Sequence, residues 1–360
     1  MSASHPAGPS RSLPAIALAL LLAFGLLAWV SAEPVHALRQ LLTGALPLPS
    51  WSADGGWQWH RLLRFRAVLD KTATLTLLGL AMLFGLRARQ FSMGADGQLM
   101  LAALAALALG LYLPPLGGWS WLLAGLAAMA VGLAWGLLPG LLKTRFEANE
   151  IVSSLMLNIV ALQLYRWIIT QGLHQPGAGF LATPALAAAA RAPQTAGGTS
   201  VMLLLIVLAP AAAWWLLQRS TWGYEIRVVG DAPDFARQAG LPVERAVWRA
   251  LALGGLFAGL AGLQLSHALL GQLPAELPQG VGFEGLVVAL LARNEPRAVP
   301  LAALLYAYLK TGAQAMELAS DVSREMVLVI QACIVLLVVS QRLLPQRWLQ
   351  ASWLKRKAAR

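Results

Sequence analysis

The sequence predicts an all-α polytopic membrane protein with about ten transmembrane helices. Hydrophobic residues make up 58% of its 360 positions, charged residues make up only 12%, and the mean hydropathy is +0.64. A typical soluble domain carries about 25% charged residues, so this composition argues against a soluble enzyme. The apolar residues also occur in long runs, and a run of about 20 residues is what an α-helix needs to cross a bilayer.

Ten apolar runs are candidate spans: 13–30, 67–86, 97–113, 119–142, 150–171, 200–218, 248–270, 283–293, 297–313 and 325–342. The first run is interpreted as a retained span, because it is longer than the apolar region of about 7 to 15 residues in a signal peptide. The alternative is a signal peptide that is cleaved after the small residues following this run. The run 283–293 is too short to cross alone and is expected to be a broken or re-entrant element. One transmembrane domain is predicted over 1–360, with its core at 67–342.

The distribution of Lys and Arg predicts that both termini lie in the cytoplasm. In that orientation the inner segments hold eighteen basic residues and the outer segments hold six. The inner segments include a polar loop at 219–247 and a basic tail at 343–360, whereas 172–199 forms an outer loop. The outer segment 31–66 mixes four arginines with tryptophans, which is typical of an amphipathic stretch lying at the membrane interface.

The net charge of +11 does not indicate a nucleic-acid partner, because the basic residues occur in short gaps between apolar runs and not on one folded face. The single cysteine, Cys333, lies within an apolar run and excludes both an intramolecular disulfide and a metal site built on cysteine. The lysines that precede a threonine lack the glycine of a phosphate-binding loop, and the five histidines are scattered. We therefore expect no ATPase activity, no other enzymatic activity and no cofactor or metal.

A weak internal repeat relates the two halves of the chain. Residues Lys143–Ile151 align with Lys310–Leu318, and Gly94–Gly97 resembles Gly282–Gly285. These matches predict an inverted repeat of spans two to five and seven to ten, with the first copies at the inner face and the second copies at the outer face. In transporters with such repeats, solute binds near the bilayer midplane at glycine-interrupted helices.

Two segments of the first half carry polar residues where lipid-facing structure would forbid them. In Phe91–Gln98, two glycines, an acid and an amide form a turn next to the membrane, in which Asp96 either caps the following helix or belongs to a pathway. In 147–158, Glu150, Ser154 and Asn158 are spaced four residues apart and form one polar stripe on an apolar helix. This stripe must face other helices or water, either as interhelical contacts or as part of a solute site.

The inner loop contains a short helix signal. Asp231 is predicted as the N-cap, Pro233 lies in the first turn and Gly240 ends a helix of about eight residues. Phe235, with the neighbouring alanines, gives this helix an apolar side. We expect this helix to dock in a groove of a partner protein. The alternative is a solvated helix at the membrane interface.

With these residues in view, the chain resembles the permease subunits of bacterial ABC importers of the ribose and branched-chain amino acid type, and within them the nucleoside and simple-sugar subgroup. The segments that carry the resemblance are Met93–Gln98, Ala148–Asn158, Arg227–Pro233 with Ala239–Leu241, and Gly282–Asn294. The subgroup's usual Asn-Ile-Gly-Ala-Glu-Gly-Gln reads Ser92-Met-Gly-Ala-Asp96-Gly-Gln here.

The resemblance implies an ATP-driven importer that moves nucleosides across the bacterial inner membrane by alternating access. A simple-sugar importer is the first alternative, and an ion-coupled secondary transporter is the second. Implied partners are cytoplasmic ATP-binding subunits, a second permease subunit, identical or different, and an extracytoplasmic substrate-binding protein. The inner loop would be the coupling element, formed by Asp231, Pro233, Phe235, Arg237 and Gly240. The predicted pathway residues are Phe91, Gln98, Asn158 and Phe283, because a nucleobase needs ring stacking and amide hydrogen bonds.

Overall fold

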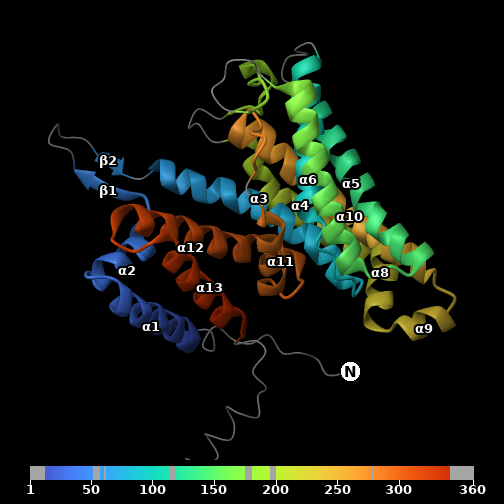
Figure 1. The fold of residues 1–360 in the computed structure, drawn as a ribbon. Helices are drawn as coiled ribbons and strands as arrows, with labels where there is room; N and C mark the ends of the chain where they lie inside the picture. Colours follow the sequence, from blue (N-terminus) through green and yellow to red (C-terminus); the bar gives the residue numbers. More distant parts are fainter. Residues whose placement is uncertain are drawn as a thin grey trace, which may run out of the picture. The chain divides into compact units, whose positions relative to one another are not determined.

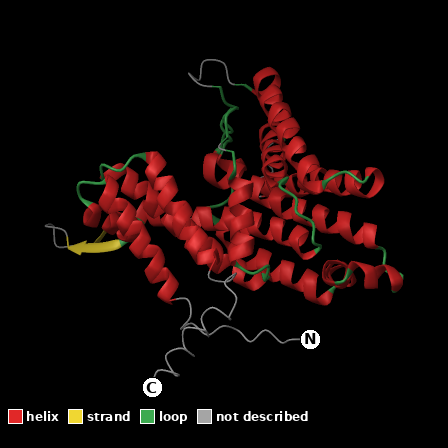
Figure 2. Cartoon of the chain, turned by 60° about the horizontal axis from the view of Figure 1, so that its bottom comes forward, coloured by secondary structure: helices red, strands yellow, loops and turns green. Residues whose placement is uncertain are grey.

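The computed structural model describes residues 13–51, 57–60, 62–113, 119–174, 181–194, 200–277 and 279–340. Its contacts divide the chain into two compact units, one formed by Met1–Val68 with Tyr308–Arg360 and the other by Leu69–Ala307. Helices make up most of the described structure, with connecting loops and one small hairpin (Figure 2). The basic tail predicted at 343–360 lies outside the described residues.

The first unit holds the two ends of the described chain. It consists of α1 (Leu13–Val30), α2 (Pro34–Thr43), the strands β1 (Leu48–Trp51) and β2 (Trp57–His60), the start of α3 (Leu62–Arg87), the end of α12 (Val299–Ala319) and α13 (Arg324–Ser340). Leu27, Leu41, Met316 and Ile330 form its core. Helix α2, in the predicted amphipathic stretch, buries Ala37 and Leu41 and exposes His36 and Arg39, and its place at the membrane interface stays a prediction.

The hairpin was not predicted. Strands β1 and β2 pair antiparallel, with Pro49 opposite Trp59 and Trp51 opposite Trp57. The alternation of Trp57, Gln58 and Trp59 is the period-two pattern of a strand, since aromatic residues favour pleated structure. The fold is therefore all-helical apart from this local pair of strands.

The second unit is a helical bundle (Figure 1). Its elements are the rest of α3, α4 (Ala95–Tyr112), α5 (Ser120–Phe146), α6 (Glu150–Ile168) with η3 (Ile169–Leu173), η4 (Ala188–Ala190), η5 (Val201–Leu204), α7 (Leu205–Arg219), α8 (Thr221–Asp231), α9 (Pro233–Gln238), α10 (Val243–Leu263) with η6 (Gln264–Leu270), α11 (Val281–Leu291), η7 (Pro296–Ala298) and the start of α12.

Helices occupy all ten predicted runs, and six described helices are long and apolar enough to cross a bilayer: Leu62–Arg87, Ala95–Tyr112, Ser120–Phe146, Glu150–Leu173, Val201–Arg219 and Val243–Leu270. Helix α11 has 11 residues, so at 1.5 Å per residue it is about 16 Å long. It is too short to cross a bilayer by itself, as its sequence predicts.

Helices α5 and α10 approach closely through small residues. Gly132 and Gly136 of α5 face Gly255 and Gly259 of α10, and a Cβ atom on Gly255 would lie 2.1 Å from the carbonyl oxygen of Gly132. Small residues spaced four apart allow such backbone contact in membranes. This contact fixes the position of α10, which forms one wall of the site described below.

The ends of three helices meet on one side of the second unit. The Arg87 guanidinium at the end of α3 donates a hydrogen bond from Nε to the Asn294 carbonyl after α11, at 2.8 Å. A Cβ atom on Gly230, near the end of α8, would lie 1.9 Å from the carbonyl oxygen of Arg87. The charge distribution predicts these three ends on the same side of the membrane, and the contacts agree with that arrangement.

Candidate functional site

Two helix N-termini meet at the centre of the candidate site. The Asp96 carboxylate, in the first turn of α4, accepts a hydrogen bond from the backbone N–H of Gly282, in the first turn of α11, at 2.7 Å. Gly282 allows this approach, because a Cβ atom there would lie 2.8 Å from the backbone nitrogen of Asp96. The carboxylate thus lies at the positive end of the α11 dipole.

This contact corrects two predictions. Gly94 is the N-cap of α4 and no side chain caps that helix, so the expectation that Asp96 caps its own helix is wrong. Asp96 lies two residues inside the helix, and its side chain reaches the unpaired N–H groups of a neighbouring helix. The Gly94–Gly97 and Gly282–Gly285 segments touch, so they do not lie at opposite faces of the membrane.

The polar stripe of α6 holds the loop between α3 and α4. The Ser154 hydroxyl accepts a hydrogen bond from the Met93 N–H at 3.0 Å. The Asn158 carboxamide donates to the Met93 carbonyl at 2.6 Å and accepts from the Gly97 N–H at 2.9 Å. The prediction that the stripe faces other parts of the protein is confirmed, since Val152 and Ile159 on the opposite side are more than half exposed.

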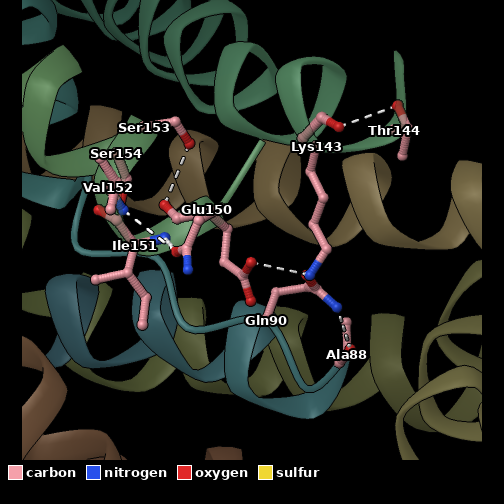
Figure 3. Close-up of polar contacts among 11 residues, drawn as sticks. Ala88, Gln90, Lys143, Thr144, Glu150, Ile151, Val152, Ser153 and Ser154 are labelled. Atoms are coloured by element: carbon pink, nitrogen blue, oxygen red, sulfur yellow. Dashed lines mark hydrogen bonds and ion pairs between the residues drawn. The ribbon is translucent and has the colours of Figure 1, made fainter. Parts of the chain in front are cut away.

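An ion pair joins α5 to Glu150, the first residue of the same stripe. The Lys143 ammonium group at the end of α5 lies 3.0 Å from the Glu150 carboxylate, and both side chains are largely buried. Figure 3 shows Lys143 reaching across to Glu150 beside Gln90, whose amide donates a hydrogen bond to the Ala88 carbonyl. The ion pair therefore joins α5 to α6, and the hydrogen bonds of Ser154 and Asn158 join α6 to the loop.

A small hollow lies next to this loop. It is lined by Ala81, Met82, Gly85, Ser92, Ala95, Gln98, Leu251 and Gly254, from α3, the following loop, α4 and α10. Its volume of about 10 Å³ has room for about one water molecule. A nucleoside or a sugar is too large for this hollow.

The structure places the four predicted pathway residues around these elements. Gln98 is buried in the wall of the hollow, and Asn158 contacts the same loop from α6. Phe91 is half-buried in that loop, and Phe283 follows Gly282 in α11 with 54% of its surface exposed. Their contact with a solute stays a prediction. Sequence reasoning missed that Asp96 joins the two helices, although the resemblance between the two Gly-x-acid-Gly segments was a signal.

The inner loop differs from its prediction at one boundary. Asp231 is the last residue of α8, and Ala232 is the N-cap of α9, so the prediction of Asp231 as the N-cap is wrong. The helix α8 continues to Asp231 because its apolar residues Ile226 and Val229 are buried. Pro233 begins α9, as expected from its fixed φ.

The predicted end of α9 is confirmed at Gly240, which has a φ of +75°. The Leu241 N–H then donates to the Ala236 carbonyl at 2.9 Å, which closes the helix end as in a Schellman motif. Ala236 packs into a small core with Val229, Val247 and Ala246. Phe235 is 61% exposed, and Arg237 beside it is also exposed, so this helix presents an aromatic and a basic side chain away from the bundle.

Arg249 joins the inner loop to α10 and was missed by sequence reasoning. Its guanidinium donates a hydrogen bond to the Glu225 carboxylate of α8 at 2.7 Å. It also lies over the ring of Trp222 at 5.1 Å and that of Trp248 at 5.7 Å. Both members of the ion pair are about four-fifths buried. A partly buried, stacked and hydrogen-bonded arginine makes a stiff connection between two helices.

Known proteins resemble this chain over most of its length. The family described as the permease component of branched-chain amino acid transport systems matches residues 65–339. A guanosine ABC transporter permease of Bacillus subtilis is 32% identical over 317 residues, which cover 84% of this chain and 89% of the relative. A glucose ABC transporter permease of Haloferax volcanii is 32% identical over 288 residues, 76% of this chain and 75% of the relative. A nucleoside ABC transporter permease of Lactococcus lactis is 23% identical over 287 residues, 75% of this chain and 77% of the relative.

Proposed function

This chain belongs to the family of permease components of branched-chain amino acid transport systems, and we propose that it is the membrane subunit of an ATP-driven importer of nucleosides. The observation that carries this proposal is the guanosine permease of Bacillus subtilis, which matches the chain over most of both lengths. The glucose permease of Haloferax volcanii matches with the same identity, so a simple sugar is the second candidate solute.

In the proposed assembly this chain carries out no covalent chemistry. Cytoplasmic ATP-binding subunits hydrolyse ATP, an extracytoplasmic binding protein delivers the solute, and a second permease subunit, identical or different, completes the membrane part. The proposed location is the bacterial inner membrane, with both termini in the cytoplasm. The basic residues at the ends of α3, α5 and α11 support this orientation, because cytoplasmic loops carry an excess of Lys and Arg.

The inner loop is the proposed contact with an ATP-binding subunit. Exposed Phe235 offers an aromatic side chain to a groove of the partner, and exposed Arg237 offers a positive charge from the other side of the same helix. Pro233 and Gly240 set the two ends of the displayed helix. Asp231 ends the preceding helix and fixes where the displayed segment begins. Arg249 connects this loop to α10, whose Leu251 and Gly254 line the hollow.

The pathway is proposed to open at the hollow beside the loop between α3 and α4. In the open state Gln98 and Asn158 offer amide groups for hydrogen bonds to the solute, and Phe91 and Phe283 offer rings for stacking on a nucleobase. Exposure of Phe283 and the position of Gln98 in the wall of the hollow support this assignment. Alternating access would then expose the same residues first to the outer side and later to the cytoplasm.

The proposal is tested by following uptake of labelled guanosine in cells that contain this chain. Depletion of ATP with the ion gradient intact should abolish uptake, and excess unlabelled nucleosides should compete where ribose and glucose do not. Competition by sugars alone would move the assignment to the second candidate. Uptake that persists without ATP would contradict an ATP-driven importer and favour an ion-coupled transporter.

A further inference from the structure

The π-helix η6 (Gln264–Leu270) holds buried polar atoms that have no partner. Gln264 has no exposed surface, and neither its Nε2 nor its Oε1 atom makes a hydrogen bond. His267, which is 2% exposed, contacts the Ser266 hydroxyl through Nδ1 at 2.9 Å, but its Nε2 has no partner. Among the described residues, Gln264 is the only side chain with two such atoms.

Burial of these polar atoms without hydrogen bonds raises the free energy of the folded bundle. A buried amide that lacks its hydrogen bonds loses its hydration without compensation, and native proteins seldom leave such groups unpaired. A π-helical turn also departs from the better hydrogen-bond geometry of the α-helix and occurs frequently at functional sites. Both features point to a partner that Gln264 meets in another conformation of the protein.

Gln264 lies along the α10 and η6 segment between the hollow and the outer loop. Leu251 and Gly254 of α10 line the hollow, and Gln264 follows Gly254 along the same helix at about 15 Å, since each residue rises 1.5 Å. The outer loop covers the far end of this segment: the Ala192 N–H donates to the His267 carbonyl at 3.3 Å, and the Leu186 N–H donates to the Gly271 carbonyl at 2.8 Å.

Resting on the proposed function, we propose that Gln264 is a specificity-determining contact that hydrogen-bonds the base of a purine nucleoside during passage. A carboxamide offers one acceptor and an adjacent donor. The edge of guanine offers the complementary pair, an N–H beside a carbonyl oxygen, so both orphaned atoms of Gln264 would be satisfied at once. An apolar side chain of the same length would leave the base unpaired in a dry passage, where this is costly.

The test uses the complete transporter in proteoliposomes, with ATP and saturating labelled guanosine. Gln264→Met keeps the length of the side chain and removes both polar atoms. We expect guanosine uptake to fall about tenfold, while the midpoint of thermal unfolding of the complex stays the same or rises, because an unpaired buried amide has been removed. The loss should be smaller for purine riboside, which lacks the amino and oxo groups of guanine.

The matched control is Gln163→Met, which changes an exposed glutamine on α6 and should leave uptake unchanged. Full guanosine uptake by Gln264→Met, or a loss that is equal for guanosine and purine riboside, would overturn the inference and leave the proposed function standing. A loss accompanied by a lower unfolding midpoint would assign Gln264 to packing and also overturn it. Absence of nucleoside uptake by the unmodified transporter would overturn the proposed function together with this inference.

Discussion

The carboxylate of Asp96 caps the N-terminus of α11 through the backbone N–H of Gly282, at 2.7 Å. The two residues belong to the two Gly-x-acid-Gly segments whose resemblance suggested a repeat, and each lies in the first turn of its helix. Gly282 in the first turn of α11 is buried, so the unpaired N–H groups there need acceptors within the protein. Asp96 supplies one of them from a neighbouring helix.

Asp96→Ala should therefore destabilise the second unit and impair uptake. Loss of a charged acceptor at a helix N-terminus costs about 1–2 kcal/mol in the free energy of unfolding. Thermal unfolding of the purified protein measures this cost, with Glu276→Ala as the control, because Glu276 is an exposed carboxylate whose pair with Arg166 spans 3.8 Å. Asp96→Glu should restore most of the stability, and an unfolding midpoint unchanged in Asp96→Ala would contradict the capping role.

Asn158→Leu tests the attachment of the loop to α6. The change leaves the Met93 carbonyl and the Gly97 N–H without their partners, and we expect a loss of about 1–3 kcal/mol in the free energy of unfolding together with reduced uptake. Asn158→Asp keeps the acceptor for Gly97. If Asn158 also contacts the solute, Asn158→Asp should lose uptake more than stability. Unchanged uptake and stability in Asn158→Leu would remove this residue from the site.

Much of this arrangement could be predicted from the sequence, and the remainder depends on contacts between distant segments. The long apolar runs predict the helices, and the four-residue spacing of Ser154 and Asn158 predicts a polar face on α6. The partner of Asp96 could not be predicted, because capping by a neighbouring helix depends on how α4 and α11 cross. The unpaired state of Gln264 is likewise a property of packing, since the same residue on a lipid-accessible surface near the interface would be hydrated.

Arg249→Lys tests the connection between the inner loop and α10. Lysine keeps the charge but loses the planar group that lies over Trp222 and Trp248. In the complete transporter we expect ATP hydrolysis to continue while guanosine uptake per ATP falls several-fold. Arg245→Lys, an exposed arginine on the same helix, is the control and should behave as the unmodified protein. An unchanged ratio of uptake to hydrolysis in Arg249→Lys would exclude this connection from coupling.

The loop between α12 and α13 should give the first unit a pH dependence. The Ser31 hydroxyl and the Ala32 N–H donate hydrogen bonds to the Asp321 carboxylate, at 2.6 and 2.8 Å, and lower its pKa below the ordinary value of 3.8. Because the folded pKa is depressed, this stabilisation is complete above pH 3.8 and is lost as the pH falls through the lowered folded pKa. Thermal unfolding between pH 2 and 7 should show a smaller acid-dependent loss for Asp321→Asn than for the unmodified protein. Equal losses in the two proteins would contradict this assignment.

The central claim is that this chain is required for ATP-driven nucleoside import. It is tested most directly by removing the chain from its cells, restoring it from a plasmid and measuring the initial rate of labelled guanosine uptake. The account predicts that uptake is lost on removal, returns on restoration and is blocked by unlabelled nucleosides. Guanosine uptake that is indifferent to removal, while uptake of labelled ribose or glucose follows the chain, would contradict the nucleoside assignment and leave a sugar permease of the same family.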